Sequence, residues 1–344
     1  MIKSWGFEFF PASHELAENF DAKKSLDYFS FYLDLWARAE EQGFDGVFLS
    51  EHHFGGGYSP SPNLLLPVIA QRTKTLRLGV MGNVLPYHNP WRIAEEIGML
   101  DHLTGGRLEV GTSAGIPAEF QKVGMETGEA RARYEEAVEV LDKALKNPVI
   151  SHTGKYWNFE ELAVVPRPVQ DPHPQLWTTV MSEESARKAA RRGSRIATGF
   201  IPTAKAKEVF DAYNEEADKA GNPSGPQELA LRRQVIIDVE EGDSQERGSQ
   251  FAEGFRNMLQ TFDKRVIAPG RKALDQPGTH GFQLGDDEFI MGSPQEVAEQ
   301  IIDQCKTSGA GHFLVTFAGH QSLEQLASSW EIYGREVIPA LHDA

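Results

Sequence analysis

The chain has 344 residues, 40% of them hydrophobic and 24% charged, a composition typical of a globular protein with an ample core. Its formal net charge of −16 argues against nucleic acid or an anionic membrane as a partner, because both would repel it. The single cysteine, Cys305, excludes an intramolecular disulfide and a cysteine metal cluster. The amino terminus lacks the apolar stretch of a secretion signal, and no apolar run approaches the ~20 residues of a membrane span, so we expect a cytoplasmic protein.

Short β-rich runs alternate with longer runs of helical period along most of the chain. The predicted strands are residues 5–9, 46–49, 76–84, 108–110, 176–180, 196–199, 230–239 and 313–317, and the clearest helices are 26–42, 63–72, 91–103 and 130–145. Eight strand–helix units predict an α/β protein whose parallel sheet closes into a (β/α)8 TIM barrel. A doubly wound open sheet is the competing interpretation, but the first strand is not followed by the glycine fingerprint of a dinucleotide site.

Two segments do not fit a bare barrel, and we treat them as insertions within a single domain of residues 1–344. Residues 146–174, before the fifth strand, are rich in proline and aromatic residues and predict a β-hairpin or a coil excursion. Residues 254–289, before the eighth strand, have mixed polarity and two Pro-Gly turns. Irregular insertions of this length are often functional, so we predict a mobile lid over the barrel mouth, with a surface excursion that touches no ligand as the alternative.

The second strand ends in the most informative segment, where an apolar run is followed by Glu51, His52 and His53. Polar groups at the carboxyl ends of parallel strands face the ligand crevice. Because successive strand residues point to opposite faces, the two histidines are poorly placed to share a metal ion, and we predict no metal site. A histidine at the mouth suits proton transfer at neutral pH. The structural alternative is that one imidazole caps a loop while the other packs.

Small residues gather at the ends of the third and fourth strands, where Gly79, Gly82 and Gly111 interrupt apolar runs. Glycine inside a strand often marks a bulge or a close approach of a ligand to the backbone. A flat ring system is therefore one prediction for this region, and easing of the barrel curvature is the other.

An anion site is predicted after the fifth strand, where Ser182 resembles a helix N-cap. The free N–H groups of a first helical turn bind phosphate readily. Glu183 and Glu184 fit a phosphate site less well, because acidic residues in a first turn also complement the helix dipole, so a capped helix without phosphate stays an alternative. Arg131 and Arg133 begin the helix after strand four and suit phosphate oxygens.

Together these segments resemble the bacterial luciferase-like, flavin-dependent monooxygenase family. The matching pieces are SEHHF at 50–54, TLRLGVMGNVLPYHNPWRIAEEIGMLDHLTGGRLEVG at 75–111, Arg131 with Glu135, MSEESARKAARRG at 181–193 and MGSPQEVAEQI at 291–301. The resemblance is collinear over nearly the whole chain. It implies a luciferase-like barrel that takes reduced FMN from a separate flavin reductase and, with O2, forms a flavin C4a-hydroperoxide that oxygenates a small organic substrate.

The resemblance also implies roles for single residues. His52 matches the family's active-site histidine, Glu51 would orient the loop or a neighbouring subunit, and Ser113 would lie beside the flavin ring. The implied cofactor contacts are Met81, Gly82, Asn83, Ser113, Arg131, Ser182 and Ser185, with a cis peptide bond between Met81 and Gly82. Ala114 departs from the pattern, since the luciferase itself has an arginine there, which puts the phosphate grip or the choice of flavin in doubt.

Two alternatives to this activity stay open. One is a hydride-transfer enzyme of the same superfamily that uses the deazaflavin F420, and the other is a flavin-binding protein without turnover. The resemblance further implies a homodimer formed through the early helices, and the apolar run at 64–69 suits either that interface or the monomer core. The organic substrate is not predicted, although aromatic residues near the strand ends suit an apolar or aromatic one.

Overall fold

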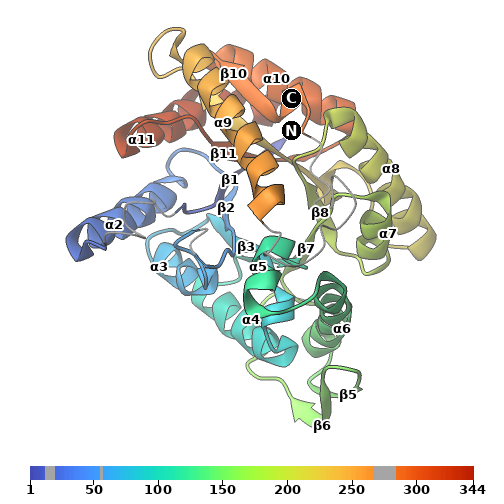
Figure 1. Cartoon of the computed structure of the whole chain (residues 1–344). Coiled ribbons are helices and arrows are strands. Elements are labelled where there is room, and N and C mark those ends of the chain that lie inside the picture. The colour runs from blue at the N-terminus through green and yellow to red at the C-terminus, as the bar shows by residue number, and fades with distance from the viewer. Residues whose placement is uncertain (12–19, 55–56, 266–283) are drawn as a thin grey trace. The chain divides into compact units, whose positions relative to one another are not determined.

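The structure, a computed structural model, describes residues 1–11, 20–54, 57–265 and 284–344 (Figure 1). Eight parallel strands belong to one sheet in the order β1 (Lys3–Glu8), β2 (Gly46–Leu49), β3 (Arg77–Val84), β4 (Leu108–Ser113), β7 (Gln175–Thr179), β8 (Arg195–Thr198), β9 (Leu229–Ile237) and β11 (His312–Phe317). Because β11 also pairs with β1, the order returns to its start. The fold is the predicted (β/α)8 barrel and not the open sheet.

The chain divides into two compact units, which are described separately. The first consists of Met1–Phe7, Arg38–Gly46 and Val180–Ala344. In it β9 pairs in parallel with β8, with β11 and with β10 (Phe289–Gly292). All nine residues of β9 are buried, as is typical of a parallel strand that is covered on both faces.

Most helices of the first unit follow a strand, and the chain ends in two successive helices after β11. The helices of this unit are α7 (Glu183–Arg191), α8 (Thr203–Ala220), α9 (Asp243–Arg265), α10 (Pro294–Ser308), α11 (Leu323–Ile332) and α12 (Ile338–Asp343). The backbone N–H of Ile2 donates to the carbonyl oxygen of Leu341 at 2.8 Å, so the two chain ends lie together in this unit (Figure 1). Cys305 is buried on α10.

The second unit consists of Glu8–Ala37 and Val47–Thr179 and contains β3, β4 and β7 in parallel register. Its helices are α2 (Ala22–Arg38), α3 (Leu66–Ala70), α4 (Pro90–Thr104), α5 (Pro117–Phe120) and α6 (Thr127–Lys146), with short 3-10 turns at η1 (Pro62–Leu64), η2 (Leu85–Tyr87) and η3 (Gln121–Val123). The helix predicted at 63–72 is therefore wrong in length, because Pro62 and Pro67 divide that segment into a 3-10 turn and a five-residue helix.

The insertion before the fifth strand is an antiparallel hairpin of β5 (Val149–Thr153) and β6 (Asn158–Ala163), as predicted. Its tip is held by the carboxylate of Glu136 on α6, which accepts hydrogen bonds from the backbone N–H groups of Lys155, Tyr156 and Trp157 at 2.9–3.1 Å. The hairpin lies beside α6 in Figure 1.

The second insertion is only partly the predicted irregular segment. Residues 254–265 continue α9, and β10 begins at Phe289, so both ends of the proposed 254–289 lid are regular structure. The prediction failed there because the mixed polarity of 243–265 conceals one amphipathic helix, and a four-residue strand carries little periodic signal. Residues 266–283 lie outside the described residues, so the lid stays a prediction. No helix among the described residues has the length and apolar character needed to cross a membrane.

Candidate active site

Glu51 lies at the centre of a buried hydrogen-bond cluster beyond the end of β2. One of its carboxylate oxygens, Oε1, accepts from Nε2 of His53 and from Nε2 of His88, each at 2.9 Å. The other, Oε2, accepts from the backbone N–H of Val84 at 3.0 Å. The side chain is only 2% exposed. The sequence segment 51–53 is thereby fastened to the segment that follows β3.

The electrostatics of this cluster favour a charged pair of Glu51 and His53. Burial raises the pKa of Glu51, but the hydrogen bonds from His53, His88 and Val84 outweigh burial and hold that pKa below its ordinary value. The hydrogen bond to Glu51 raises the pKa of His53 above its ordinary value, against the opposing effect of burial. Both shifts favour the ionised carboxylate and the protonated imidazole close to the carboxyl end of β2.

His52 contacts a different carboxylate. Its Nδ1 lies 3.0 Å from Oε1 of Glu119, and the same oxygen accepts from the backbone N–H of His53 at 3.1 Å. The His52 ring packs at 5.6 Å from the ring of Phe9 and its side chain stays 26% exposed. The adjacent histidines thus turn to separate carboxylates. Because β2 ends at Leu49, this arrangement comes from the loop after the strand and not from the strand alternation on which the prediction relied. Within the described residues no group of side chains that could hold a metal ion is found.

Two buried polar atoms of this cluster have no hydrogen-bond partner within the described part of the chain: Oε2 of Glu119 and the hydroxyl of Tyr87. The ring of Tyr87 lies edge-on to that of His53 at 5.1 Å and faces Phe120 at 5.9 Å. Burial, together with the nearby Glu119 and Glu51, raises the pKa of Tyr87. Tyr87 therefore stays a neutral donor at any ordinary pH.

The glycines of β3 and β4 fit the neighbouring strand. A Cβ atom on Gly82 would lie 2.6–2.9 Å from the backbone of Thr112, and one on Gly111 would lie 2.3 Å from the carbonyl oxygen of Val80. These distances are shorter than real Cβ contacts, so both positions require glycine for the close approach of β3 to β4. This finding favours the interpretation as strand packing over that as a ligand floor. The Met81–Gly82 bond is cis, as the resemblance predicts.

Asn83 and Ser113 are engaged in local hydrogen bonds at the ends of the same strands. Asn83 is buried, donates from Nδ2 to the carbonyl oxygen of Gly111 at 2.9 Å, and accepts from Nδ2 of Asn63 at 3.0 Å. The hydroxyl of Ser113, half-buried, accepts from the backbone N–H of Gly115 at 3.0 Å. Asn83 thus ties β3 to β4, while Ser113 stays partly accessible.

The predicted cap of α7 in the first unit is confirmed. Ser182 is the N-cap, its hydroxyl accepts from the backbone N–H of Ser185 at 3.3 Å, and the hydroxyl of Ser185 interacts in return with the Ser182 backbone, which makes a capping box. Ser182 is exposed and Ser185 is half-buried. In the second unit Arg131 is exposed on α6, whereas Arg133 pairs with Glu129 at 2.9 Å.

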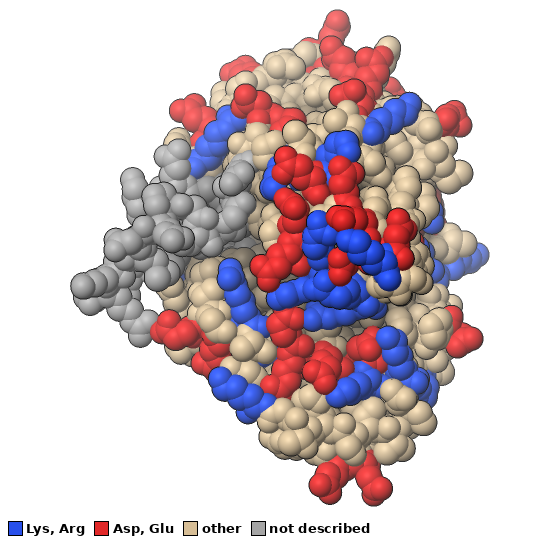
Figure 2. Space-filling view, turned by 90° about the vertical axis from the view of Figure 1, so that its right-hand side faces the viewer, with Lys and Arg blue, Asp and Glu red and all other residues tan. Residues whose placement is uncertain are grey.

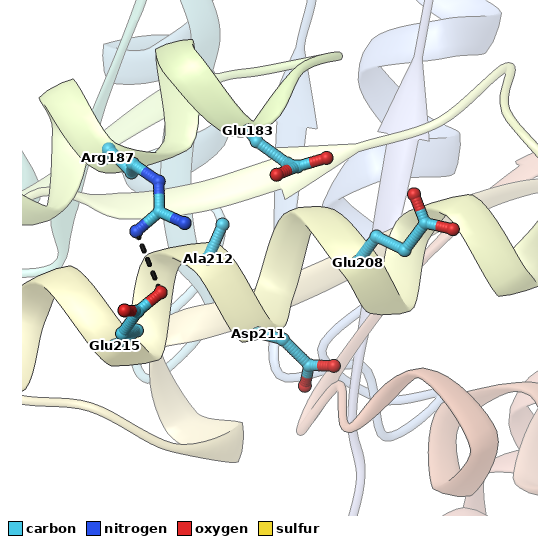
Figure 3. A pocket seen from close by; sticks show the side chains of 6 residues that line it. All are labelled: Glu183, Arg187, Glu208, Asp211, Ala212 and Glu215. Carbon is cyan, nitrogen blue, oxygen red and sulfur yellow. Dashed lines mark hydrogen bonds and ion pairs between the residues drawn. The ribbon is translucent and has the colours of Figure 1, made fainter.

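A hollow of about 460 Å3 lies between α7 and α8, where Glu183, Arg187, Glu208, Asp211, Ala212 and Glu215 line it (Figure 3). Arg187 pairs with Glu215 at 2.9 Å, and the surrounding face carries interleaved charges of both signs (Figure 2). Lys205 pairs with both Glu183 and Glu208. The hollow is open and its charges are paired with one another, so it has the character of a solvated helix surface and not of a catalytic centre.

The first unit also contains a buried ion cluster at the start of β10. Glu288 is fully buried and its carboxylate lies against the guanidinium groups of Arg232 at 2.5 Å and Arg233 at 3.5 Å. The Arg232 guanidinium stacks on the ring of Phe200 at 4.3 Å, and burial lowers its pKa to about 10. The Arg233 side chain turns to Thr203 and Gln304 on the helices, so this cluster ties β9 to α8 and α10.

Sequence reasoning missed Glu119, His88 and Tyr87. Each follows the carboxyl end of a barrel strand by three to six residues, since β3 ends at Val84 and β4 at Ser113. That offset was the available signal, because loops at this end carry function in barrels of this kind. The three residues lie in or directly after the short helices η2 and α5, which have too few residues to show a helical period in the sequence.

The comparisons with known proteins agree on one family. Residues 10–312 match the family model described as luciferase-like monooxygenase. The oxygenase component of flavin-dependent trigonelline monooxygenase from Acinetobacter baylyi is 23% identical over 94% of this chain and 93% of its own length.

Solved structures of low sequence identity share the fold. The oxygenating constituent of 3,6-diketocamphane monooxygenase from Pseudomonas putida, a type II Baeyer-Villiger monooxygenase solved in complex with FMN, has a TM-score of 0.77 at 22% identity and covers 98% of this chain and 99% of its own. An F420-dependent secondary alcohol dehydrogenase has a TM-score of 0.73 at 17% identity and covers 99% of both chains. One barrel thus serves two kinds of cofactor chemistry.

Proposed function

The chain belongs to the luciferase-like monooxygenase family, and from this premise we propose that it is the oxygenase of a two-component flavin-dependent monooxygenase. The overall reaction consumes reduced FMN, O2 and a small organic substrate. One oxygen atom enters the substrate, the other leaves as water, and FMN is released oxidised for a separate flavin reductase to reduce. The trigonelline relative, which is named as an oxygenase component, supports this division of labour.

The observation that carries the proposal is the carboxylate-anchored histidine pair at the end of β2. Reduced flavin supplies the electrons that activate O2, so the protein must hold a ring, exclude water and place a group that moves protons. His52 has one ring nitrogen engaged by Glu119 and keeps part of its side chain exposed. A partly exposed, oriented imidazole is the residue type that such proton transfer requires.

Other residues near the ends of β3 and β4 suit contacts with the flavin ring. We assign Met81, Gly82, Asn83 and Ser113 to them, with Glu51 as the residue that holds the His52 segment in place. Only Ser113 is partly exposed among these strand residues, so it is the one whose side chain fits a direct contact. Contacts from β3 are then expected to come from the backbone, because Asn83 is committed to β4.

For the phosphate of FMN we propose two anchors, which are tested separately. In the first unit the capped turn of α7 offers the hydroxyls of exposed Ser182 and half-buried Ser185 and the N–H groups of a helix start. In the second unit Arg131 offers an exposed guanidinium on α6. Substitution of either anchor by alanine is expected to weaken FMN binding more than binding of riboflavin, which lacks the phosphate.

F420-dependent hydride transfer is the second candidate function, and the fold shared with an F420-dependent dehydrogenase supports it. Equilibrium binding under anaerobic conditions separates the two. The proposal expects reduced FMN to bind and reduced F420 to compete poorly. Binding of F420 alone, with substrate reduction in the absence of O2, would replace the proposal by the second candidate, and binding of FMN without turnover would leave a flavin carrier.

His52→Ala tests the proposed proton-transfer residue. The variant is expected to bind reduced FMN as wild type does and to consume O2, but to form product at least about 100-fold more slowly, the usual scale for loss of a general acid or base. Unchanged coupling of O2 consumption to product would remove His52 from the mechanism.

We also propose a homodimer. The apolar run at 64–69 is split in the structure: Leu66 and Ile69 are buried, whereas Leu64 is 74% and Val68 39% exposed. Met99 on the neighbouring α4 is 54% exposed. This apolar face suits a second copy of the chain. Sedimentation equilibrium is expected to give a dimer for wild type and a monomer for Leu64→Glu; a monomeric wild type would contradict this assignment.

A further inference from the structure

Glu119 is held rigidly beside His52 by the packing of its neighbour. Phe120 is 2% exposed and packs with Val84 and Ala130 in a small hydrophobic core. Glu119 and Phe120 belong to α5, whose N–H groups bond back to the carbonyl oxygen of Ile116. The backbone of α5 is thereby fixed, and the Glu119 side chain reaches the 52–53 segment from a defined position.

The contact determines which ring nitrogen of His52 carries hydrogen. A carboxylate oxygen only accepts hydrogen bonds, and Nδ1 of His52 lies 3.0 Å from Oε1 of Glu119. Nδ1 must therefore be the protonated nitrogen, and in the neutral imidazole Nε2 is left with its lone pair. Without the carboxylate both tautomers are open to the ring.

Burial of the Glu119 carboxylate lowers the stability of the fold, and a role in the site would explain why a carboxylate is present there. Glu119 is 5% exposed, its side-chain hydrogen bonds in the described part of the chain go through Oε1 to His52 and to the His53 backbone, and Oε2 has no hydrogen-bond partner there. A buried carboxylate that is compensated on one oxygen alone destabilises the fold relative to a neutral side chain. Glu51, by comparison, uses both oxygens in three hydrogen bonds.

We infer that Glu119 is the positioning residue of the reaction: it fixes His52 in the Nδ1–H tautomer and orientation, so that Nε2 is the atom that takes up and returns a proton. The inference rests on the proposed function, because it assigns Glu119 to the same site. Glu119 acts through His52 and needs no contact with the substrate or the cofactor.

The test begins with the tautomer of His52, measured by long-range 1H–15N NMR on wild-type protein without flavin, with His52→Asn to assign the signal. The inference predicts the Nδ1–H form as the dominant neutral tautomer, and a mixture of both tautomers in Glu119→Gln. A dominant Nε2–H form in wild type, or an unchanged spectrum in Glu119→Gln, overturns it. The dominant tautomer of His52 is measured on wild-type protein, so this part of the test holds even if Glu119→Gln does not fold.

The second readout is coupling during turnover. Glu119→Gln is expected to bind reduced FMN within about twofold of wild type and to lose about 10- to 100-fold in the rate of product formation, the scale seen when the outer partner of a functional histidine is removed. Glu119→Asp, which keeps the charge, is expected to recover part of that rate. Glu160→Gln, at an exposed position on β6, is the matched control.

The outcomes separate this inference from the proposed function. If the tautomer changes in Glu119→Gln while product formation does not, Glu119 has only a structural role and the inference is wrong. If wild type has the Nδ1–H tautomer yet forms no product from reduced FMN and O2 with any substrate, the proposed function fails, and with it the assignment of Glu119 to that reaction.

Discussion

Replacement of Glu51 by glutamine removes the charge that holds the histidine cluster together. Glutamine keeps the size of the side chain and one acceptor oxygen, but the carboxylate of Glu51 accepts three hydrogen bonds, at 2.9, 2.9 and 3.0 Å. Hydrogen bonds to charged groups contribute about 1.5–3 kcal/mol each, and a glutamine can still accept one of them. We therefore expect Glu51→Gln to lower the free energy of unfolding by about 3–5 kcal/mol, as for a broken buried charge pair.

The loss is expected to depend on pH with a defined sign. The native pKa of Glu51 lies below 4.5, so its contribution is present above pH 4.5 and is lost as the pH falls through the depressed native pKa. The native pKa of His53 lies above 6.5, so its contribution is complete below pH 6.5 and is lost as the pH rises through the raised native pKa. The difference between wild type and Glu51→Gln is therefore largest from about pH 4.5 to 6.5 and smaller on both sides.

Urea unfolding of both proteins at a series of pH values measures this difference. Glu160→Gln serves as control, because its side chain is exposed on β6 and a surface substitution changes stability by only about 0.5 kcal/mol. A difference that stays below about 1 kcal/mol, or one that does not change with pH, would refute the charged Glu51–His53 pair.

Three further outcomes follow from the packing. Ser182→Ala, which removes the cap of α7, is expected to lower stability by about 1 kcal/mol in thermal unfolding, and no change would contradict the capping box. Gly82→Ala places a Cβ atom 2.6–2.9 Å from the Thr112 backbone and is expected to destabilise by about 1–3 kcal/mol, whereas Gly128→Ala, with open space around it, should be neutral or stabilising; equal effects would refute the steric argument. Glu288→Ala removes the buried carboxylate between Arg232 and Arg233 and leaves Arg233 only the more distant Asp287, at 3.9 Å; it is expected to lower stability by about 3–5 kcal/mol in urea unfolding, which an unchanged midpoint would disprove.

The barrel was predictable because its signals are local and repeat. Apolar runs of strand length alternated with helical periods, and the eight strands of the barrel were all identified from that pattern. The short elements were not: β10 has four residues, and α5 also has four. Elements of this length carry too few residues for a period, and their formation is decided by tertiary packing, as the burial of Phe120 shows.

The site was predictable only in its centre. The sequence alone identified the run of Glu51, His52 and His53, because ionisable residues directly after an apolar strand are unusual. The partners that complete the hydrogen-bond network, Glu119 and His88, lie 67 and 37 residues away along the chain from the groups they contact. Only the fold brings them together, so a single sequence gives no reason to pair them.

The glycines of β3 and β4 were correctly identified as unusual, but the structure explains them by strand packing and not by a ligand. Gly82 and Gly111 were unusual residues for strand interiors, and both are required by the close approach of β3 and β4. A ligand that lies against the strand and a close approach of two strands both require glycine in the sequence. Only the atoms that a Cβ would contact in the structure distinguish the two causes.

The most direct measurement of the central claim is rapid mixing of the anaerobic complex with reduced FMN against buffer that contains O2, followed by absorbance. We expect a transient spectrum that belongs to neither reduced nor oxidised FMN. The substrate should accelerate the decay of this spectrum, and in His52→Ala the decay should not be accompanied by product formation at the wild-type rate. Direct conversion of reduced to oxidised FMN at the rate seen without protein would contradict it.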